Sequence, residues 1–107
     1  MNTAAALEQA EVTLREDGTV AVGGALTFDT VPRVFEQSSA WLERSGGAIT
    51  IDLRDVSRAD SAGLALFVEW LRRAKTKGRP LTFVNAPEQV RSLIRVNGLE
   101  RALGVGS

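Results

Sequence analysis

Alternating apolar and polar residues form the first pattern along the chain, and they predict a pair of short strands. We expect strands at residues 11–16 and 19–22, joined by a tight turn at Asp17-Gly18, because these two residues tolerate positive φ. Gly23-Gly24 should then break the second strand, since glycine weakens strand structure. The start of the chain therefore predicts an antiparallel hairpin.

Helical spacing of apolar residues follows the hairpin. Asp29 or Thr30 can cap a helix whose first turn accommodates Pro32, because the missing N–H of proline does no harm there. The Ser-Gly-Gly segment at 45–47 should end this helix. The face that we expect to cover a sheet carries Val31, Val34, Phe35, Ser38 and Leu42.

The middle of the chain continues with a strand and a second helix. Apolar residues at every second position predict a central strand over 48–53, and we expect the polar segment 54–60 to be irregular. The second helix is predicted over 61–77 and should end at Gly78. Its buried stripe should consist of Leu64, Phe67, Val68, Leu71 and Ala74.

The C-terminal quarter predicts a fourth strand over 81–84 and a third helix. Asn85 should cap this helix with Glu88 as its reciprocal partner, and Asn97-Gly98 should end it. A last short helical turn is expected at 99–103. The residues of the third helix that should face the core are Val90, Leu93 and Ile94.

The order of these elements, β-β-α-β-α-β-α, predicts an α/β fold with a mixed four-stranded sheet covered by helices. The hairpin should be antiparallel, and the two strand-helix-strand crossovers should be parallel and right-handed. A length of 107 residues is typical of one domain, so we expect a single domain over 1–107. Residues 1–10 are compatible with a flexible start.

The charge balance and two missing residue types narrow the function. Thirteen Lys and Arg balance thirteen Asp and Glu, so no surplus of positive charge favours nucleic acid as a partner. The chain has no His, which removes the commonest general base and metal ligand. It also has no Cys, which removes disulfides and thiolate sites and fits a reducing compartment. We expect a protein that docks on a partner and is not an enzyme.

Two features argue against a direct tie to a membrane. Residues 1–10 contain no Lys or Arg and are interrupted by Glu8, unlike a secretory signal. The apolar run at 62–68 is followed at once by Glu69, and a membrane helix needs about 20 apolar residues. We therefore expect a cytoplasmic protein without membrane insertion.

Segment 55–64 follows the central strand, and parallel sheets place their sites in such loops. Asp60 or Ser61 should cap the second helix, and Gly63 in its first turn indicates that something approaches the backbone. One interpretation is a plain cap followed by a small residue, and the other is a recognition or phosphorylation point at Ser61. A phosphate there would meet free helix N–H donors beside Asp60 and Asp55, and it would weaken docking.

Three kinds of chemical site are set aside. Residues 59–63 are similar to the serine elbow of hydrolases, but no His exists to activate the hydroxyl. Asp52, Asp55 and Asp60 lack the second acidic pair of a magnesium cluster. Gly23-Gly24 stands in neither of the common phosphate-binding motifs. We expect no catalytic residue, no metal and no cofactor.

The outer face of the second helix is unusually mixed for a solvated surface. A Trp beside a Leu and an Arg is a combination enriched at protein interfaces. The other interpretation is that Leu66 and Trp70 widen the buried stripe under a neighbouring helix, and the sequence leaves both open. This face carries Ala62, Ala65, Leu66, Glu69, Arg72 and Arg73, with Trp70 at its border.

The loop resembles that of the STAS domain family of sulfate transporters and anti-sigma-factor antagonists, whose pattern is a strand, D-[ST]-x-G-[LI] and a helix. Here the motif reads Asp60-Ser61-Ala62-Gly63-Leu64, and the resemblance covers nearly the whole chain. Four further stretches are similar to the MlaB branch, the STAS subunits of phospholipid ABC transporters. These stretches are residues 56–66, 74–78, 84–85 and 97–99.

The resemblance implies a cytoplasmic accessory subunit, peripheral to the inner membrane, that docks on the MlaF-like ATP-binding subunit of such a transporter. It would support assembly and ATPase activity, and so outer-membrane lipid asymmetry. The alternative is an anti-sigma-factor antagonist regulated by phosphorylation of Ser61, because the motif is common to both branches. The residues expected to bind the partner are Asp60, Ser61, Ala62, Gly63, Ala65, Leu66, Glu69, Trp70 and Arg73.

Overall fold

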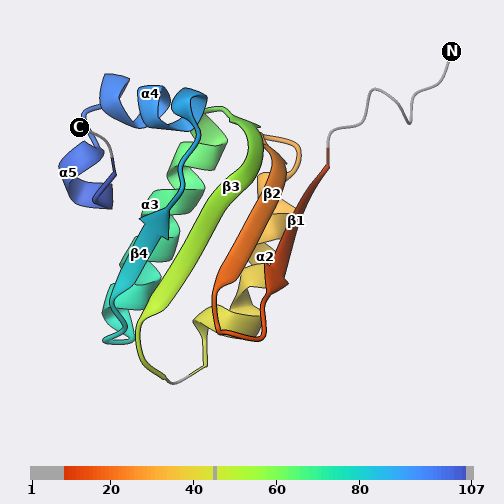
Figure 1. Cartoon of the computed structure of the whole chain (residues 1–107), viewed down its shortest axis with the longest axis vertical. Coiled ribbons are helices and arrows are strands. Elements are labelled where there is room, and N and C mark those ends of the chain that lie inside the picture. The colour runs from red at the N-terminus through yellow and green to blue at the C-terminus, as the bar shows by residue number, and fades with distance from the viewer. Residues whose placement is uncertain (1–8, 45, 106–107) are drawn as a thin grey trace, which may run out of the picture.

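The computed structural model describes residues 9–44 and 46–105, and within them four strands form one mixed sheet (Figure 1). β1 pairs antiparallel with β2, whereas β2 with β3 and β3 with β4 pair in parallel. The predicted hairpin and the two parallel crossovers are therefore confirmed. The strands, in spatial order, are β1 (Ala10–Leu14), β2 (Val20–Leu26), β3 (Ile49–Ala59) and β4 (Leu81–Val84).

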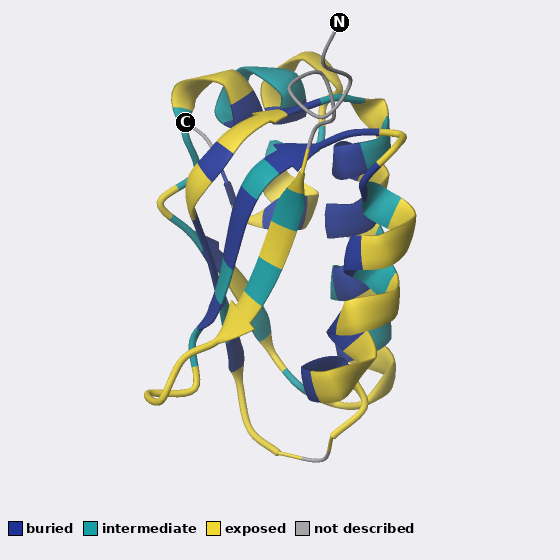
Figure 2. Ribbon diagram, turned by 90° about the vertical axis from the view of Figure 1, so that its right-hand side faces the viewer, coloured by how far each residue is buried: buried dark blue, intermediate teal, exposed yellow. Residues whose placement is uncertain are grey.

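Two long helices cover one face of the sheet, and two shorter ones follow β4 (Figure 1). α2 and α3 lie side by side behind the sheet, and α4 lies near the end where β3 finishes. Figure 2 shows the buried residues of the sheet and the helices facing each other across one core. The helices are α2 (Val31–Leu42), α3 (Ser61–Thr76), α4 (Glu88–Val96) and α5 (Glu100–Leu103).

Aromatic side chains from three elements meet in this core. The Trp70 ring centroid lies 5.4 Å from that of Trp41 in an edge-to-face arrangement, and Phe67 lies 5.3 Å from Phe83. Phe67 and Trp70 are also neighbours, with centroids 6.2 Å apart. Aromatic pairs at such distances add to the stabilisation from area burial. The cluster fixes α3 against both α2 and β4.

Two strands are longer than predicted. β2 continues through Gly23-Gly24 to Leu26, with register shifts against β3 on both sides of the glycine pair. Gly24 has φ of 86°, and a Cβ there would meet the Gln9 carbonyl, so a glycine lets β2 pass close to the start of β1 without a break. At both register shifts the extra residue lies on β3. β3 runs on to Ala59 because this longer β2 pairs with it, so the expected irregular segment 54–60 is wrong.

The ends of the helices differ from the prediction in detail. The N-cap position of α4 is Pro87 and not Asn85, which has φ of 59° and whose amide donates to Asp52. Gly78 adopts φ of 69° just after α3, as expected of a helix-ending glycine. The expectations for residues 1–8 and for Ser45 lie outside the described residues.

The buried stripe of α3 is also displaced from the predicted one. Val68 is 39% exposed and Leu71 is half-buried, whereas Leu66 and Trp70 are fully buried. Leu64, Phe67 and Ala74 are buried as predicted. The helix presents its core face both to the sheet and to α2, so the stripe is wider and is rotated toward α2.

Candidate functional site

The ends of β2 and β3 bring two loops together at one end of the molecule (Figure 1). Leu26 pairs with Ala59, and the Asp60 N–H donates to the Leu26 carbonyl at 3.0 Å. α2 and α3 start directly after these loops. The site predicted at the loop after the central strand therefore has a second wall, made by the β2–α2 loop.

Asp60 holds both loops with one carboxylate. Its Oδ1 accepts hydrogen bonds from the N–H groups of Ala62 at 2.8 Å and Gly63 at 3.4 Å, which caps α3. Its Oδ2 accepts from the N–H of Phe28 at 3.1 Å. Asp60 is thus a brace between the two loops, and both of its oxygens are engaged within the chain.

Gly63 is the point where α3 touches the ends of the strands. A Cβ at this position would lie 2.8 Å from the Leu26 carbonyl oxygen and 3.0 Å from the Cβ of Ala59. The close approach predicted at Gly63 exists, but the chain itself makes it. Gly63 is buried, so its assignment to the partner-binding surface is wrong.

Ser61 is exposed at the first position of α3. The two following N–H groups are already bound by Asp60, so the expectation that a phosphate on Ser61 would meet these donors free is wrong. Asp55 pairs with Gly23, four residues before Ala59 and so about 13 Å away along the strand. Asp60 is therefore the nearby carboxylate, and a phosphate would extend toward solvent.

An apolar groove of about 430 Å³ lies between the N-terminal halves of α2 and α3, and its α3 wall begins at Ala62, the residue after Ser61. The sequence pattern predicts only the α3 wall, because it assigns Val31 and Phe35 on the α2 side to the face that covers the sheet and gives Phe28 no role. The lining residues are Phe28, Val31, Pro32 and Phe35 on one side and Ala62, Ala65, Leu66 and Glu69 on the other.

Phe28 is the most exposed aromatic residue at this site, with 80% of its surface accessible. Two threonines hold its loop. The Thr30 hydroxyl donates to the Ala25 carbonyl at 2.6 Å and accepts from the Thr27 N–H at 3.0 Å, while the Thr27 hydroxyl accepts from Asp29. Both threonines are buried, so the loop presents Phe28 to solvent from a fixed base.

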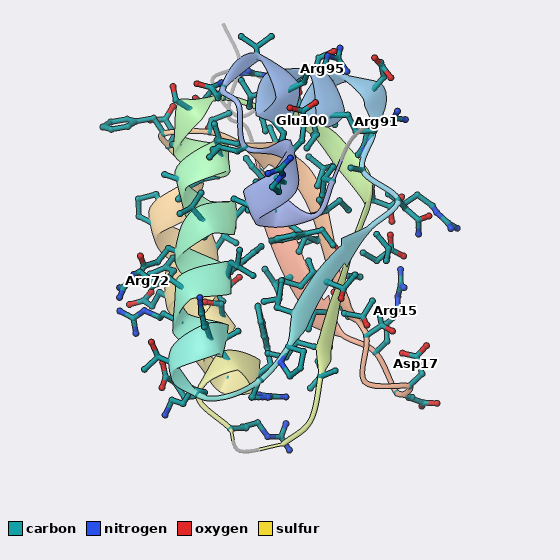
Figure 3. The ribbon with its side chains drawn as sticks, turned by 90° about the vertical axis from the view of Figure 1, so that its left-hand side faces the viewer. Arg15, Asp17, Arg72, Arg91, Arg95 and Glu100 are labelled. Carbon is teal, nitrogen blue, oxygen red and sulfur yellow. The ribbon has the colours of Figure 1, made fainter. Side chains whose placement is uncertain are left out.

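A charged network closes the far end of the groove. Glu69 accepts hydrogen bonds from Arg72 at 2.6 Å and Arg73 at 3.0 Å, and these bonds, Arg72 first, lower the pKa of the Glu69 carboxyl. Arg73 also bonds Glu43 on the α2 side and lies 5.0 Å over the Phe35 ring. Figure 3 shows Arg72 projecting from the outer side of α3. Glu69 and Arg73 therefore tie α3 to α2 at the surface.

Two residues assigned to the docking surface are buried. Trp70 is completely buried against Trp41 and Phe67, so it belongs to the core, and its assignment to partner binding is wrong. Leu66 is only 2% exposed, at the floor of the groove. The interpretation that both residues widen the buried stripe is therefore confirmed. Ala65 is exposed and Ala62 half-buried on the groove wall.

Two of the three aspartates considered for a metal are engaged by other groups of the chain. Asp52 binds Arg15 and Asn85, whereas Asp60 caps α3. Among the described residues, no three acidic, His or Cys side chains are grouped in a way that could hold a metal ion. In the same part of the chain, no helix combines the length and apolarity needed to cross a membrane.

Comparison with known proteins gives the family. The family model described as "Mlab, STAS domain" matches residues 6–105. The chain is 30% identical over 86 residues to the anti-sigma-B factor antagonist of Staphylococcus aureus, covering 80% of each chain. The antagonist of Staphylococcus epidermidis matches to the same extent.

Solved structures agree on the fold. The crystal structure of a putative anti-sigma factor antagonist from Thermotoga maritima superposes with a TM-score of 0.71 at 20% identity, covering 87% of this chain and 81% of that one. The antagonist SpoIIAA in its unphosphorylated form gives 0.67 at 18% identity, covering 92% and 99%. On the family match and this architecture, the chain belongs to the STAS domain family.

Proposed function

We propose that this chain is an anti-sigma-factor antagonist: it docks on an anti-sigma factor through the groove beside Ser61, and phosphorylation of Ser61 releases it. One observation carries the proposal, namely that Ser61 is exposed and directly precedes Ala62, a residue that lines an apolar groove between α2 and α3. The similarity to the Staphylococcus antagonists over 80% of the chain supports it. In this proposal the chain only binds, and a separate kinase phosphorylates Ser61.

The groove provides the binding energy in this proposal. Phe28 is 80% exposed on the rim of the groove, and aromatic residues, Phe included, are enriched where protein interfaces are buried. Ala62 and Ala65 on the opposite wall have small side chains, so a partner side chain can reach Leu66 at the floor of the groove. The loop around Phe28 is already braced by Asp60 and the threonines, which limits the entropy lost on docking.

Phosphorylation acts in this proposal as an electrostatic switch that leaves the fold intact. A phosphate adds nearly two negative charges next to the Asp60 carboxylate. Because Asp60 already occupies the N–H groups of Ala62 and Gly63, the new charge has to be desolvated whenever a partner covers it. Docking is therefore weakened by repulsion and desolvation, without unfolding the first turn of α3.

A second candidate is the accessory subunit of a phospholipid ABC transporter. The description of the matching family model, which carries the name Mlab, favours it. In that case the same surface docks on the ATP-binding subunit, and the chain lies in the cytoplasm, peripheral to the inner membrane. It influences ATP turnover by binding one state of the ATPase better than another, because equal affinity would shift nothing.

Affinity purification from the cells of origin separates the two candidates. A tagged chain and its Ser61→Ala, Ser61→Glu and Ser39→Glu variants are compared, with captured proteins identified by mass spectrometry. Ser39→Glu is the matched control, because Ser39 is an exposed serine near the other end of α2 whose hydroxyl bonds only within its helix. Ser61→Glu should lose the partner, whereas Ser61→Ala and Ser39→Glu should retain it.

The identity of the captured protein then decides the function. A sigma-regulating kinase that phosphorylates the wild-type chain but not Ser61→Ala supports the antagonist. Membrane transporter subunits without such a kinase support the second candidate. Full recovery of either partner by the Ser61→Glu chain places the docking surface away from Ser61 and refutes the switch.

A further inference from the structure

The second half of β3 lacks a strand neighbour on one side. Within the described residues, β4 pairs with β3 only at Ile49–Asp52, while β2 accompanies β3 as far as Ala59. Ala59 is the last residue before the Asp60-Ser61 turn. At its C-terminal end, β3 therefore pairs with β2 on one edge. On the other edge β4 does not reach it, so the backbone groups there need a different partner.

The side chain of Gln89 fills this position. Its Oε1 accepts a hydrogen bond from the Ala59 N–H at 2.8 Å, and its Nε2 donates to the Ala59 carbonyl at 2.9 Å. A glutamine amide has the same donor and acceptor as a peptide group. Gln89 thus satisfies both backbone groups of one residue, as a longer neighbouring strand would do.

Gln89 is itself held in place by α4. It is the second residue of this helix, and the next residue, Val90, is fully buried together with Ile94. On the other side of the bond pair, Ala59 touches the backbone of α3, since its Cβ would lie 3.0 Å from a Cβ on Gly63. A continuous set of contacts therefore leads from the core-anchored α4 through Gln89 and Ala59 to the first turn of α3.

We propose that Gln89 is the positioning residue of the Asp60-Ser61 turn. Its amide fixes the position of Ala59 at the end of β3, and so the position of Ser61 two residues later. The significance of the turn as a docking site rests on the proposed function, whereas the positioning itself does not. Without the two bonds, the Ala59 N–H and carbonyl lose their protein partners, and the strand end keeps its pairing with β2 and its packing against α3.

Hydrogen exchange of the full-length chain tests the positioning without any partner. Backbone amides of the wild type, Gln89→Ala and Gln37→Ala are compared by NMR under native conditions. Gln37→Ala is the matched control, because Gln37 is an exposed helical glutamine outside the groove. The informative amides are those of Ala59, of Asp60, which bonds Leu26, and of Leu64, which bonds Asp60.

In Gln89→Ala the Ala59 amide should exchange faster by on the order of tenfold, and the Asp60 and Leu64 amides by a smaller factor. The amide of Ile51, near the start of β3 where β4 pairs with it, should keep its rate. Equal acceleration of Ile51 would show that Gln89 only stabilises the whole fold, and unchanged rates at Ala59 would show that it positions nothing. Either result overturns the proposal, while the purification experiment tests the proposed function separately.

Discussion

The carbonyl oxygen of Leu26 occupies the space that a side chain on Gly63 would need, since a Cβ there would lie 2.8 Å from it. Leu26 ends β2 and Gly63 lies in the first turn of α3, so this contact joins the two halves of the candidate site. The Asp60 N–H bonds the same carbonyl at 3.0 Å. The position of Ser61 relative to the Phe28 loop therefore depends on a glycine at position 63.

Gly63→Ala tests this contact, because two effects predict opposite changes in the free energy of unfolding. Helix propensity alone would stabilise the chain by about 1 kcal/mol, whereas overpacking against backbone should destabilise it by about 1–3 kcal/mol. Since a backbone carbonyl cannot rotate away as a long side chain can, we expect net destabilisation in urea unfolding. Ser61→Ala, at an exposed position two residues earlier, should stay within about 0.5 kcal/mol of the wild type. A Gly63→Ala chain that is more stable than wild type contradicts the close contact.

Phe28→Ala should separate docking from stability. Phe28 is 80% exposed, so its removal should change the free energy of unfolding by no more than about 0.5 kcal/mol. If the groove is the docking surface, the same change should weaken partner capture by about tenfold or more, as hot-spot aromatic residues do. Val96→Ala is a suitable control, since Val96 is 82% exposed on α4 and does not line the groove. Undiminished capture by Phe28→Ala argues that the partner binds elsewhere.

Trp70→Ala, in contrast to Phe28→Ala, should strongly reduce the stability of the fold. Trp70 is completely buried between Trp41 and Phe67, so truncation should cost about 3–5 kcal/mol of unfolding free energy. This loss is a large part of the about 5–15 kcal/mol that stabilises a domain, so the melting temperature should fall by roughly 10 °C or more. Thermal unfolding followed by circular dichroism measures the effect. A well-folded Trp70→Ala chain with impaired docking would restore Trp70 to the interface.

The contrast between Phe28 and Trp70 shows what the sequence could predict about the site. The order of elements, the cap at Asp60 and the exposure of Ser61 follow from local patterns, because spacing and capping involve neighbours in the chain. The roles of Leu66 and Trp70 depend on how closely α2 packs against α3, which no local pattern contains. Phe28 belongs to the site only because β2 runs past Gly23-Gly24 and ends beside Ala59.

The same limit applies to the strands. Two bulges disturb the alternation of buried and exposed residues in β3, so its second half resembles an irregular polar loop. The role of the Gln89 amide cannot be predicted from the spacing of apolar and polar residues either, because its partner Ala59 lies thirty residues away in the chain. Long-range pairing therefore accounts for most of what the pattern of the chain could not predict.

Asp52 gives a prediction about pH that is independent of the docking site. It is 6% exposed on β3, and it accepts hydrogen bonds from the Arg54 N–H at 2.9 Å, Asn85 at 3.1 Å and Arg15 at 3.0 Å. Arg15, labelled in Figure 3, lies in the N-terminal hairpin and forms an ion pair with Asp52. Burial raises the pKa of Asp52, but these bonds outweigh burial and leave the pKa below its ordinary value of 3.8.

Because the pKa of Asp52 is lower in the folded chain than in the unfolded chain, the carboxylate stabilises the fold above pH 3.8, and this contribution is lost as the pH falls through the folded value. We expect the urea midpoint of Asp52→Asn to be lower than that of the wild type at pH 7, and the two curves to converge toward pH 2. Asp17, Glu43 and Glu69 also have lowered pKa values, but they are present in both chains, so the difference isolates Asp52. Asp29→Asn, which removes an exposed carboxylate, controls for net charge. A difference that stays constant from pH 7 to pH 2 would mean that Asp52 contributes by its shape and not by its charge.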